Sequence, residues 1–120
     1  MYTVIWTENF LKQAKRQGRS NDEMVSIVST LADDPTAGNI MKDTGGARKL
    51  RHMGRGGGKS GGYRSIHYFC GDDVPIFLLA IYGKDRKANL SKAERNKLAM
   101  VLPKIADAYK ANGCRPNTFR

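Results

Sequence analysis

Two neighbouring segments in the middle of the chain, residues 63–70 and 74–82, constrain the fold more than any other feature. Both are rich in aromatic and β-branched residues, and the second is almost wholly apolar. The residues between them, Gly71-Asp72-Asp73, have the composition of a short hairpin loop. The sequence therefore predicts two antiparallel strands, and the apolar second strand is expected at the centre of a sheet.

A third strand is expected from Ala47, where the pattern acquires a period of two. Successive side chains of a strand point to opposite faces, so Lys49 and Arg51 should project from the same side. The segment GRGGGKSGG, residues 54–62, then leads into the strand at 63. Because Met53 stands where a phosphate-binding P-loop needs its first glycine, this segment is interpreted as a mobile hairpin connection or as a loop that closes on a substrate.

Helix signals precede and follow these strands. In the N-terminal part, a strand over residues 2–6 is followed by a helix that Thr7 caps and Gly18 ends, and by a second helix that starts after Ser20 or Asn21 and stops before Pro35. Near the C-terminus, Ser91 and Glu94 have the spacing of a capping box. The apolar face of that last helix continues to Gly113, and a kink or two shorter helices are expected at Pro103, which lacks an N–H.

The order of these elements predicts a small α+β domain, in which an N-terminal strand and a three-stranded antiparallel meander form the sheet. Helices are expected to cover one face of it. A chain of 120 residues fits a single domain, residues 1–120. Two cysteines, Cys70 and Cys114, give no support for a disulfide framework, so a reducing cytoplasm is expected. The longest apolar run has seven residues, so no membrane-spanning segment is expected.

The charge of the chain is uneven. The sequence has 21 Lys and Arg against 11 Asp and Glu, a formal net charge of +10. Residues 1–44 carry five basic and six acidic side chains, whereas residues 45–120 carry sixteen and five. A strongly basic C-terminal part indicates a polyanionic partner such as a nucleic acid. Six basic residues between 45 and 70 have no acidic residue among them: Arg48, Lys49, Arg51, Arg55, Lys59 and Arg64.

Three segments in this basic part resemble a known family. RKLR at 48–51, GKSGGYRSIHY at 58–68 and IYGKDRKANLSKAE at 81–94 are similar to the RelE/ParE superfamily of toxins from bacterial toxin–antitoxin pairs, particularly its HigB-like branch. The likeness spans nearly the whole chain, and its specific part runs from about residue 47 to 97. The C-terminal end ANGCRPNTFR departs from the pattern, because it lacks the tyrosine that some relatives have there.

The resemblance implies a ribosome-dependent endoribonuclease that enters the aminoacyl site of the small subunit and cuts messenger RNA. It implies no metal and no cofactor, and a cognate antitoxin that restrains the toxin. The family's catalytic positions correspond to Lys49, Arg51, Arg64 and Lys84. Further residues expected to contact RNA are Arg48, Arg55, Lys59, Tyr82 and Lys87.

The chemistry can also be argued from the residues. RNA is cleaved by its own 2′-hydroxyl when that proton is removed, the phosphorane is neutralised and the leaving oxygen is protonated. Arg64 suits the phosphate because its planar fork bonds two oxygens. Lys49 would act as the base only if Arg48 and Arg51 disfavour its charged form. His52 and His67 are further acid or base candidates, although a lone strand histidine is more often structural.

The sequence leaves two points open, the side of the strand that Arg64 shares and the choice among functions. Ile66, Tyr68 and Cys70 share the side of Arg64, so either the active face is partly apolar or a bulge shifts the register. The fold also permits a ParE-like, non-enzymatic inhibitor of DNA gyrase, and the charge permits a passive nucleic-acid-binding protein.

Overall fold

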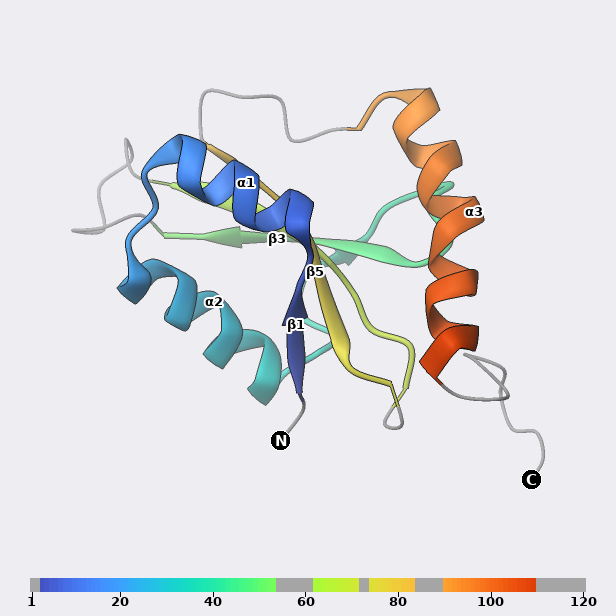
Figure 1. Cartoon of the computed structure of the whole chain (residues 1–120), viewed down its shortest axis with the longest axis horizontal. Coiled ribbons are helices and arrows are strands. Elements are labelled where there is room, and N and C mark those ends of the chain that lie inside the picture. The colour runs from blue at the N-terminus through green and yellow to red at the C-terminus, as the bar shows by residue number, and fades with distance from the viewer. Residues whose placement is uncertain (1–2, 54–61, 72–73, 84–89, 110–120) are drawn as a thin grey trace.

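The computed structural model describes residues 3–53, 62–71, 74–83 and 90–109, and it contains a five-stranded mixed sheet with three helices. Figure 1 shows the sheet between two helices on one side and the third helix on the other. The elements in chain order are β1 (Val4–Trp6), α1 (Glu8–Gln17), α2 (Asn21–Asp33), β2 (Asn39–Ile40), β3 (Ala47–His52), β4 (Tyr63–Tyr68), β5 (Ile76–Gly83) and α3 (Lys92–Tyr109).

The predicted α+β class and the antiparallel meander are confirmed, and the sheet has the order β1-β5-β4-β3-β2. β1 pairs with β5 in parallel, and the other neighbours are antiparallel. Two details of the prediction were wrong. β4, and not β5, is the middle strand of the sheet. The two-residue β2 was not expected at all.

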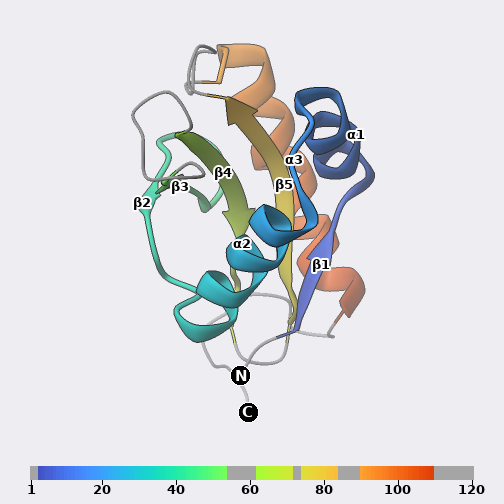
Figure 2. The same cartoon turned by 90° about the vertical axis from the view of Figure 1, so that its left-hand side faces the viewer.

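The helices cover both faces of the sheet, which corrects the expectation that they cover one. α1 and α2 contribute Phe10, Ala14, Ile27 and Leu31 to one core cluster. α3 contributes Leu102 and Ala106 to a second cluster on the opposite face. In the view of Figure 2, α2 lies in front of β4 and β5, and α3 lies behind them.

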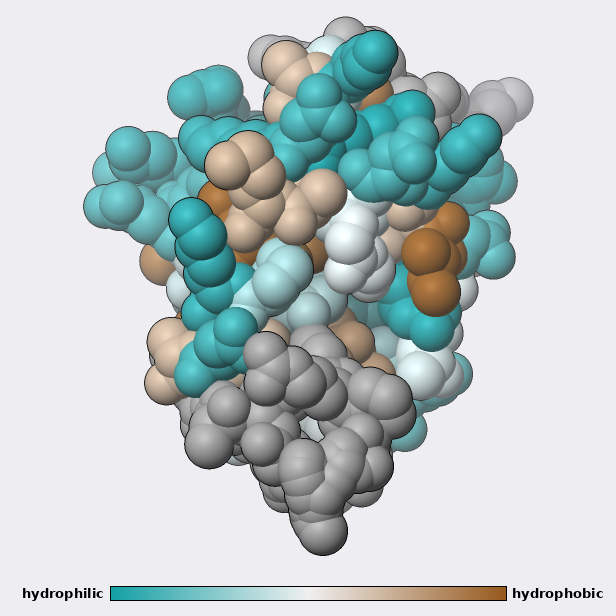
Figure 3. Space-filling view, turned by 90° about the vertical axis from the view of Figure 1, so that its right-hand side faces the viewer, coloured by the Kyte–Doolittle hydropathy of each residue, from teal (hydrophilic) through white to brown (hydrophobic). Residues whose placement is uncertain are grey.

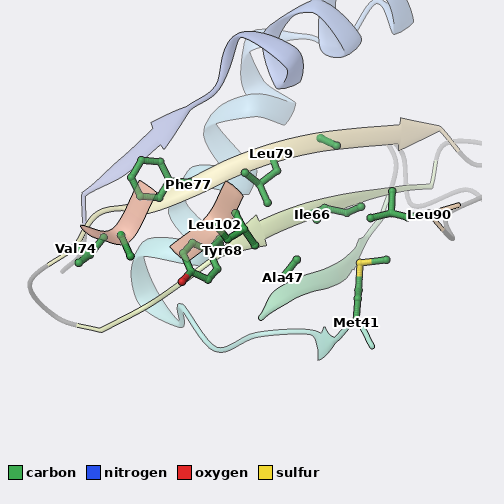
Figure 4. Close-up of a cluster of buried hydrophobic side chains, with 11 residues drawn as sticks. Met41, Ala47, Ile66, Tyr68, Val74, Phe77, Leu79, Leu90 and Leu102 are labelled. Atoms are coloured by element: carbon green, nitrogen blue, oxygen red, sulfur yellow. The ribbon is translucent and has the colours of Figure 1, made fainter. Parts of the chain in front are cut away.

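Strand β5 serves both clusters, because its side chains alternate between the two faces. Ile76 and Leu78 belong to the cluster under α1 and α2, whereas Phe77 and Leu79 belong to the cluster under α3. Figure 4 shows the α3 cluster, where Leu102 of the helix lies near Tyr68 of β4. Burial on both faces explains why this strand is apolar almost throughout.

The helix termini agree with the sequence signals. The Thr7 side chain accepts a hydrogen bond from the backbone N–H of Phe10, and Gly18 ends α1 in the left-handed conformation. Ser20 and Glu23 form a reciprocal capping box at the start of α2. The Ser91–Glu94 pair caps α3 in the same way. α3 is a single helix with Pro103 inside it, so of the two expected forms, a kink or two shorter helices, the second is excluded.

The structure also bears on the expectations about disulfides and membrane-spanning segments. Cys70 takes part in a disulfide bond, which the sequence analysis did not expect. No helix in the described ranges is both long and apolar enough to cross a membrane. The expected end of the last helix at Gly113 and the hairpin residues Asp72 and Asp73 lie outside the described part.

Side chains of helix α1 form hydrogen bonds with the backbone groups of β5 beyond the point where β1 ends. The Gln13 Oε1 atom accepts a hydrogen bond from the backbone N–H of Ile81 at 2.9 Å, and Gln17 Nε2 donates to the Ile81 carbonyl at 2.8 Å. Asn9 Nδ2 donates to the Leu79 carbonyl at 2.9 Å. Side chains of α1 thus take the place of a neighbouring strand along this part of β5.

Replacement of Gln13 by leucine tests this arrangement. The change leaves the buried backbone N–H of Ile81 without its acceptor, which is expected to lower the free energy of unfolding by about 1–3 kcal/mol. Urea denaturation would measure the loss, with the exposed Lys12→Ala on the same helix as the control. Equal midpoints for the two variants would contradict the edge role of α1.

Candidate functional site

Four of the predicted site residues lie together on the sheet face that α3 partly covers. Arg51 of β3 stands directly opposite Arg64 of β4, and Arg64 stands opposite Tyr82 of β5. Lys49 lies two residues before Arg51 and is therefore on the same face. We call Lys49, Arg51, Arg64 and Tyr82 the polar row. The prediction that Lys49 and Arg51 share one side of their strand is confirmed.

The register of β4 shows why Arg64 shares its side of the strand with apolar residues. β3 and β4 pair without interruption from Ala47–Tyr68 to His52–Tyr63. The irregularity lies in the pairing with β5, where Ile66 is opposite Ala80 and His67 is opposite Leu78. Arg64 therefore keeps the same side as Ile66 and Tyr68, and the face is polar at one end and apolar at the other.

The apolar end of this face is the core under α3. Ile66 and Tyr68 are buried there with Ala47 and with Leu90, which precedes α3. Arg64, Lys49 and Tyr82 are partly buried, and Arg51 is exposed. On the side that carries α3, hydrophilic residues cover much of the surface and hydrophobic ones form separate patches (Figure 3). The row thus offers positive charge and a phenol at the border of a rigid core.

Tyr82 lies where two helices meet the sheet. Burial raises the pKa of its hydroxyl, and the negative charge of Glu94 raises that pKa further, while a hydrogen bond with the Gln13 side chain acts in the opposite direction. The hydroxyl is therefore protonated at neutral pH and can donate a hydrogen bond or a proton. Sequence reasoning missed Gln13 and Glu94 as neighbours of Tyr82, because no local pattern links three such distant positions.

His52 and His67 lie on the opposite face of the sheet, toward α1 and α2. His52 Nε2 is 2.7 Å from Ser65 Oγ, and its ring stacks on Tyr63 with the centroids 5.0 Å apart. His67 Nε2 donates to the Pro35 carbonyl at 3.0 Å. Burial lowers the pKa of both rings, for His52 to about 4. These contacts indicate that both histidines stabilise the fold, on the face opposite to the polar row.

Arg48 also lies on the α1 and α2 face, directly opposite His67. Its Nη1 donates to the carbonyls of Thr36 and Gly38, at 2.9 and 3.3 Å. Gly38 has a positive φ of 87°, and a Cβ there would stand 2.4 Å from the Lys49 carbonyl oxygen. Arg48 and His67 therefore fix the segment between α2 and β2 against the sheet, and the Arg48 side chain lies on the opposite face of the sheet from Lys49.

Several predicted site residues cannot be placed. Lys84, and the expected RNA contacts Arg55, Lys59 and Lys87, lie outside the described residues. The question of whether the glycine-rich segment closes on a substrate falls on the same part of the chain. Within the described ranges, no three His, Cys, Asp or Glu side chains are grouped so as to hold a metal ion.

A comparison with known protein families identifies the family to which the chain belongs. The profile of the family described as the RelE toxin of the RelE / RelB toxin-antitoxin system matches residues 2–112. The match includes all of the strands and helices that carry the polar row. Such a toxin has a cognate antitoxin as its partner. Because the match covers nearly the whole chain, this protein belongs to the RelE toxin family.

Proposed function

We propose that this toxin is a ribosome-dependent endoribonuclease that cuts translated messenger RNA in the aminoacyl site and so blocks translation. The observation that carries the proposal is the polar row, in which Arg51, Arg64 and Tyr82 follow one another across three strands on one face. Membership of the RelE toxin family supports the same conclusion.

The groups in the row match the needs of cleavage by the 2′-hydroxyl. Arg64 and Arg51 can bind the non-bridging oxygens and neutralise the charge that develops on the phosphorane. Tyr82, held protonated by its surroundings, can protonate the departing 5′-oxygen. Lys49 is proposed to accept the 2′-hydroxyl proton, and Lys84 to contribute a further cation after the last strand.

This chemistry needs no divalent cation, because the charge stabilisation comes from side chains. Guanidinium and ammonium groups repel metal ions, and the row itself has no carboxylate or imidazole to bind one. We therefore propose metal-independent cleavage without a cofactor.

The partners of the proposed activity are the ribosomal small subunit, messenger RNA and the antitoxin, and its place is the cytoplasm, where ribosomes translate. We further propose the HigB-like branch within the family, which the segments RKLR, GKSGGYRSIHY and IYGKDRKANLSKAE support. Two alternatives are a ParE-like gyrase inhibitor and a passive nucleic-acid binder.

Primer extension on a message translated in a reconstituted system tests the proposal. Purified protein should produce discrete breaks on programmed ribosomes, leave naked RNA intact at equimolar protein and leave gyrase supercoiling unchanged. Inhibited supercoiling with intact messages would establish the gyrase alternative, and RNA binding without breaks would establish the passive one. Rapid degradation of naked RNA would show that the ribosome is not required.

The product ends give a second prediction. Attack by the 2′-hydroxyl leaves a 2′,3′-cyclic or 3′-phosphate on one fragment and a 5′-hydroxyl on the other, because the nucleophile belongs to the RNA itself. Mass spectrometry of fragments from pre-formed ribosome complexes, quenched at intervals, would identify these ends. A 5′-phosphate product would rule out the proposed role of the polar row.

A further inference from the structure

A cleft separates the loop between β2 and β3 from the first turns of α3. Its volume is about 540 Å³, within the range of sites that hold small molecules. Lys92, Arg95, Asn96 and Ala99 line one wall, and they form a stripe because residues three and four apart are neighbours on a helix. Asp43 and Gly45 line the other wall.

The loop and the helix touch at one end of this cleft. A Cβ on Gly45 would stand 3.2 Å from the Ala99 Cα, and Gly45 has a positive φ of 81°. Glycine therefore allows the loop to rest on the helix at this point, and the cleft extends from there to Lys92. The close approach of Gly45 to Ala99 therefore marks one end of the cleft.

The polar groups along the walls are not paired with each other. Asp43 makes no ion pair with Lys92 or Arg95 in the described part of the chain, although their charges are opposite. Arg95 Nε is buried and has no hydrogen-bond partner among the described residues. The Arg95 side chain as a whole is only partly buried and lines the cleft, so its guanidinium can form charge-assisted hydrogen bonds with an oxyanion bound there.

The position of the cleft relates it to the polar row. Ala47, two residues after Gly45, faces α3, as do Lys49 and Arg51 further along the same strand. The cleft and the row therefore lie on the same side of the sheet, and an RNA strand that passes over the row can extend toward α3. A guanidinium and an ammonium suit a phosphate, and an amide and a carboxylate suit a 2′-hydroxyl or a base edge.

We propose that this cleft binds one nucleotide next to the cleaved bond, with its phosphate held by Arg95 and Lys92. The inference rests on the proposed function, because it takes RNA as the substrate. Asn96 and Asp43 contact the sugar or the base of that nucleotide. Arg95 contributes to the binding of RNA and takes no part in bond breaking.

Binding to a single-stranded RNA that carries 2′-O-methyl groups, and so resists cleavage, tests the inference. Arg95→Ala should weaken binding about 5- to 20-fold and reduce the slope of log affinity against log salt by about 0.7, the value for one phosphate contact on a single strand. Lys97→Ala is the matched control, because it removes the same charge from an exposed position of α3 outside the cleft. That variant should stay within twofold of the parent.

The outcomes separate this inference from the proposed function. Equal effects of Arg95→Ala and Lys97→Ala, in a parent protein that cleaves on ribosomes, would overturn the subsite alone. A parent that neither binds nor cleaves RNA would overturn the proposed function as well. Unchanged RNA affinity with lost antitoxin binding would assign the cleft to a protein partner and also overturn the subsite. Arg95→Lys, which keeps the charge and recovers part of the affinity, would show that Arg95→Ala does not act by unfolding.

Discussion

Replacement of Arg64 by alanine is expected to slow messenger cleavage on programmed ribosomes about 100- to 1000-fold, which corresponds to about 2.7–4 kcal/mol of transition-state stabilisation. Arg64 is in the middle strand, between Arg51 and Tyr82, so it lies at the centre of the polar row. Primer extension at equal soluble protein levels would measure the rate. Lys49→Ala should also lose activity, because the proposed mechanism uses it to accept a proton.

The same change should not destabilise the fold. Arg51 and Arg64 are like charges directly opposite each other on neighbouring strands, an arrangement that costs up to about 1 kcal/mol. The alanine variant should therefore melt at the same temperature as the parent or slightly higher. Arg16→Ala, an exposed arginine of α1, is the control and should keep full activity. An Arg64→Ala variant as active as that control would show that the polar row is not the catalytic site.

Acidification is expected to remove roughly 3 kcal/mol of stability through His52 alone between pH 7 and pH 4. Burial, followed by the nearby charge of His67, lowers the pKa of the folded His52 ring from 6.5 to about 4. The unfolded chain therefore binds more protons in this window, so stability rises with pH there and falls as the pH is lowered. His67 acts in the same direction, because burial lowers its pKa too.

Urea unfolding of the parent and of His52→Gln, over a series of pH values, isolates this contribution. The variant lacks the titrating ring, so its stability should fall less than that of the parent between pH 7 and pH 4. Carboxylates titrate equally in the two proteins and cancel in the comparison. Parallel pH profiles would mean that His52 is not buried in its neutral form.

The strands and helix caps could be predicted from the sequence because their signals are local. Alternation placed Lys49 and Arg51 together. The N-cap candidates Ser20 and Asn21 and the Ser91–Glu94 spacing marked two helix starts that the structure confirms. The apolar run of β5 also held information that the prediction did not use. A strand that is apolar on both faces needs cover on both, so helices on the two sides of the sheet were already implied.

Other parts depend on contacts between distant segments, and no sequence pattern reports them. β2 has two residues, which is too short for any period to be seen. The hydrogen bonds from α1 to the edge of β5 use glutamine and asparagine side chains that look like ordinary surface residues. Within the site, Arg48 belonged to the same basic cluster as Lys49, and only its contacts with Thr36 and Gly38 reveal its separate role.

The alternation of β3 also limits how this protein can change during evolution. Lys49 and Arg51 lie on the face of the polar row, while Arg48 and His52, one position away, hold the structure on the other side. Insertion or deletion of one residue within 47–52 would exchange the two sets, placing the cations of the polar row under α1 and α2 and the anchoring residues on the face of the polar row. Point substitutions can therefore change the polar row gradually. An insertion or deletion in this strand keeps each side chain on its own face only when it involves an even number of residues.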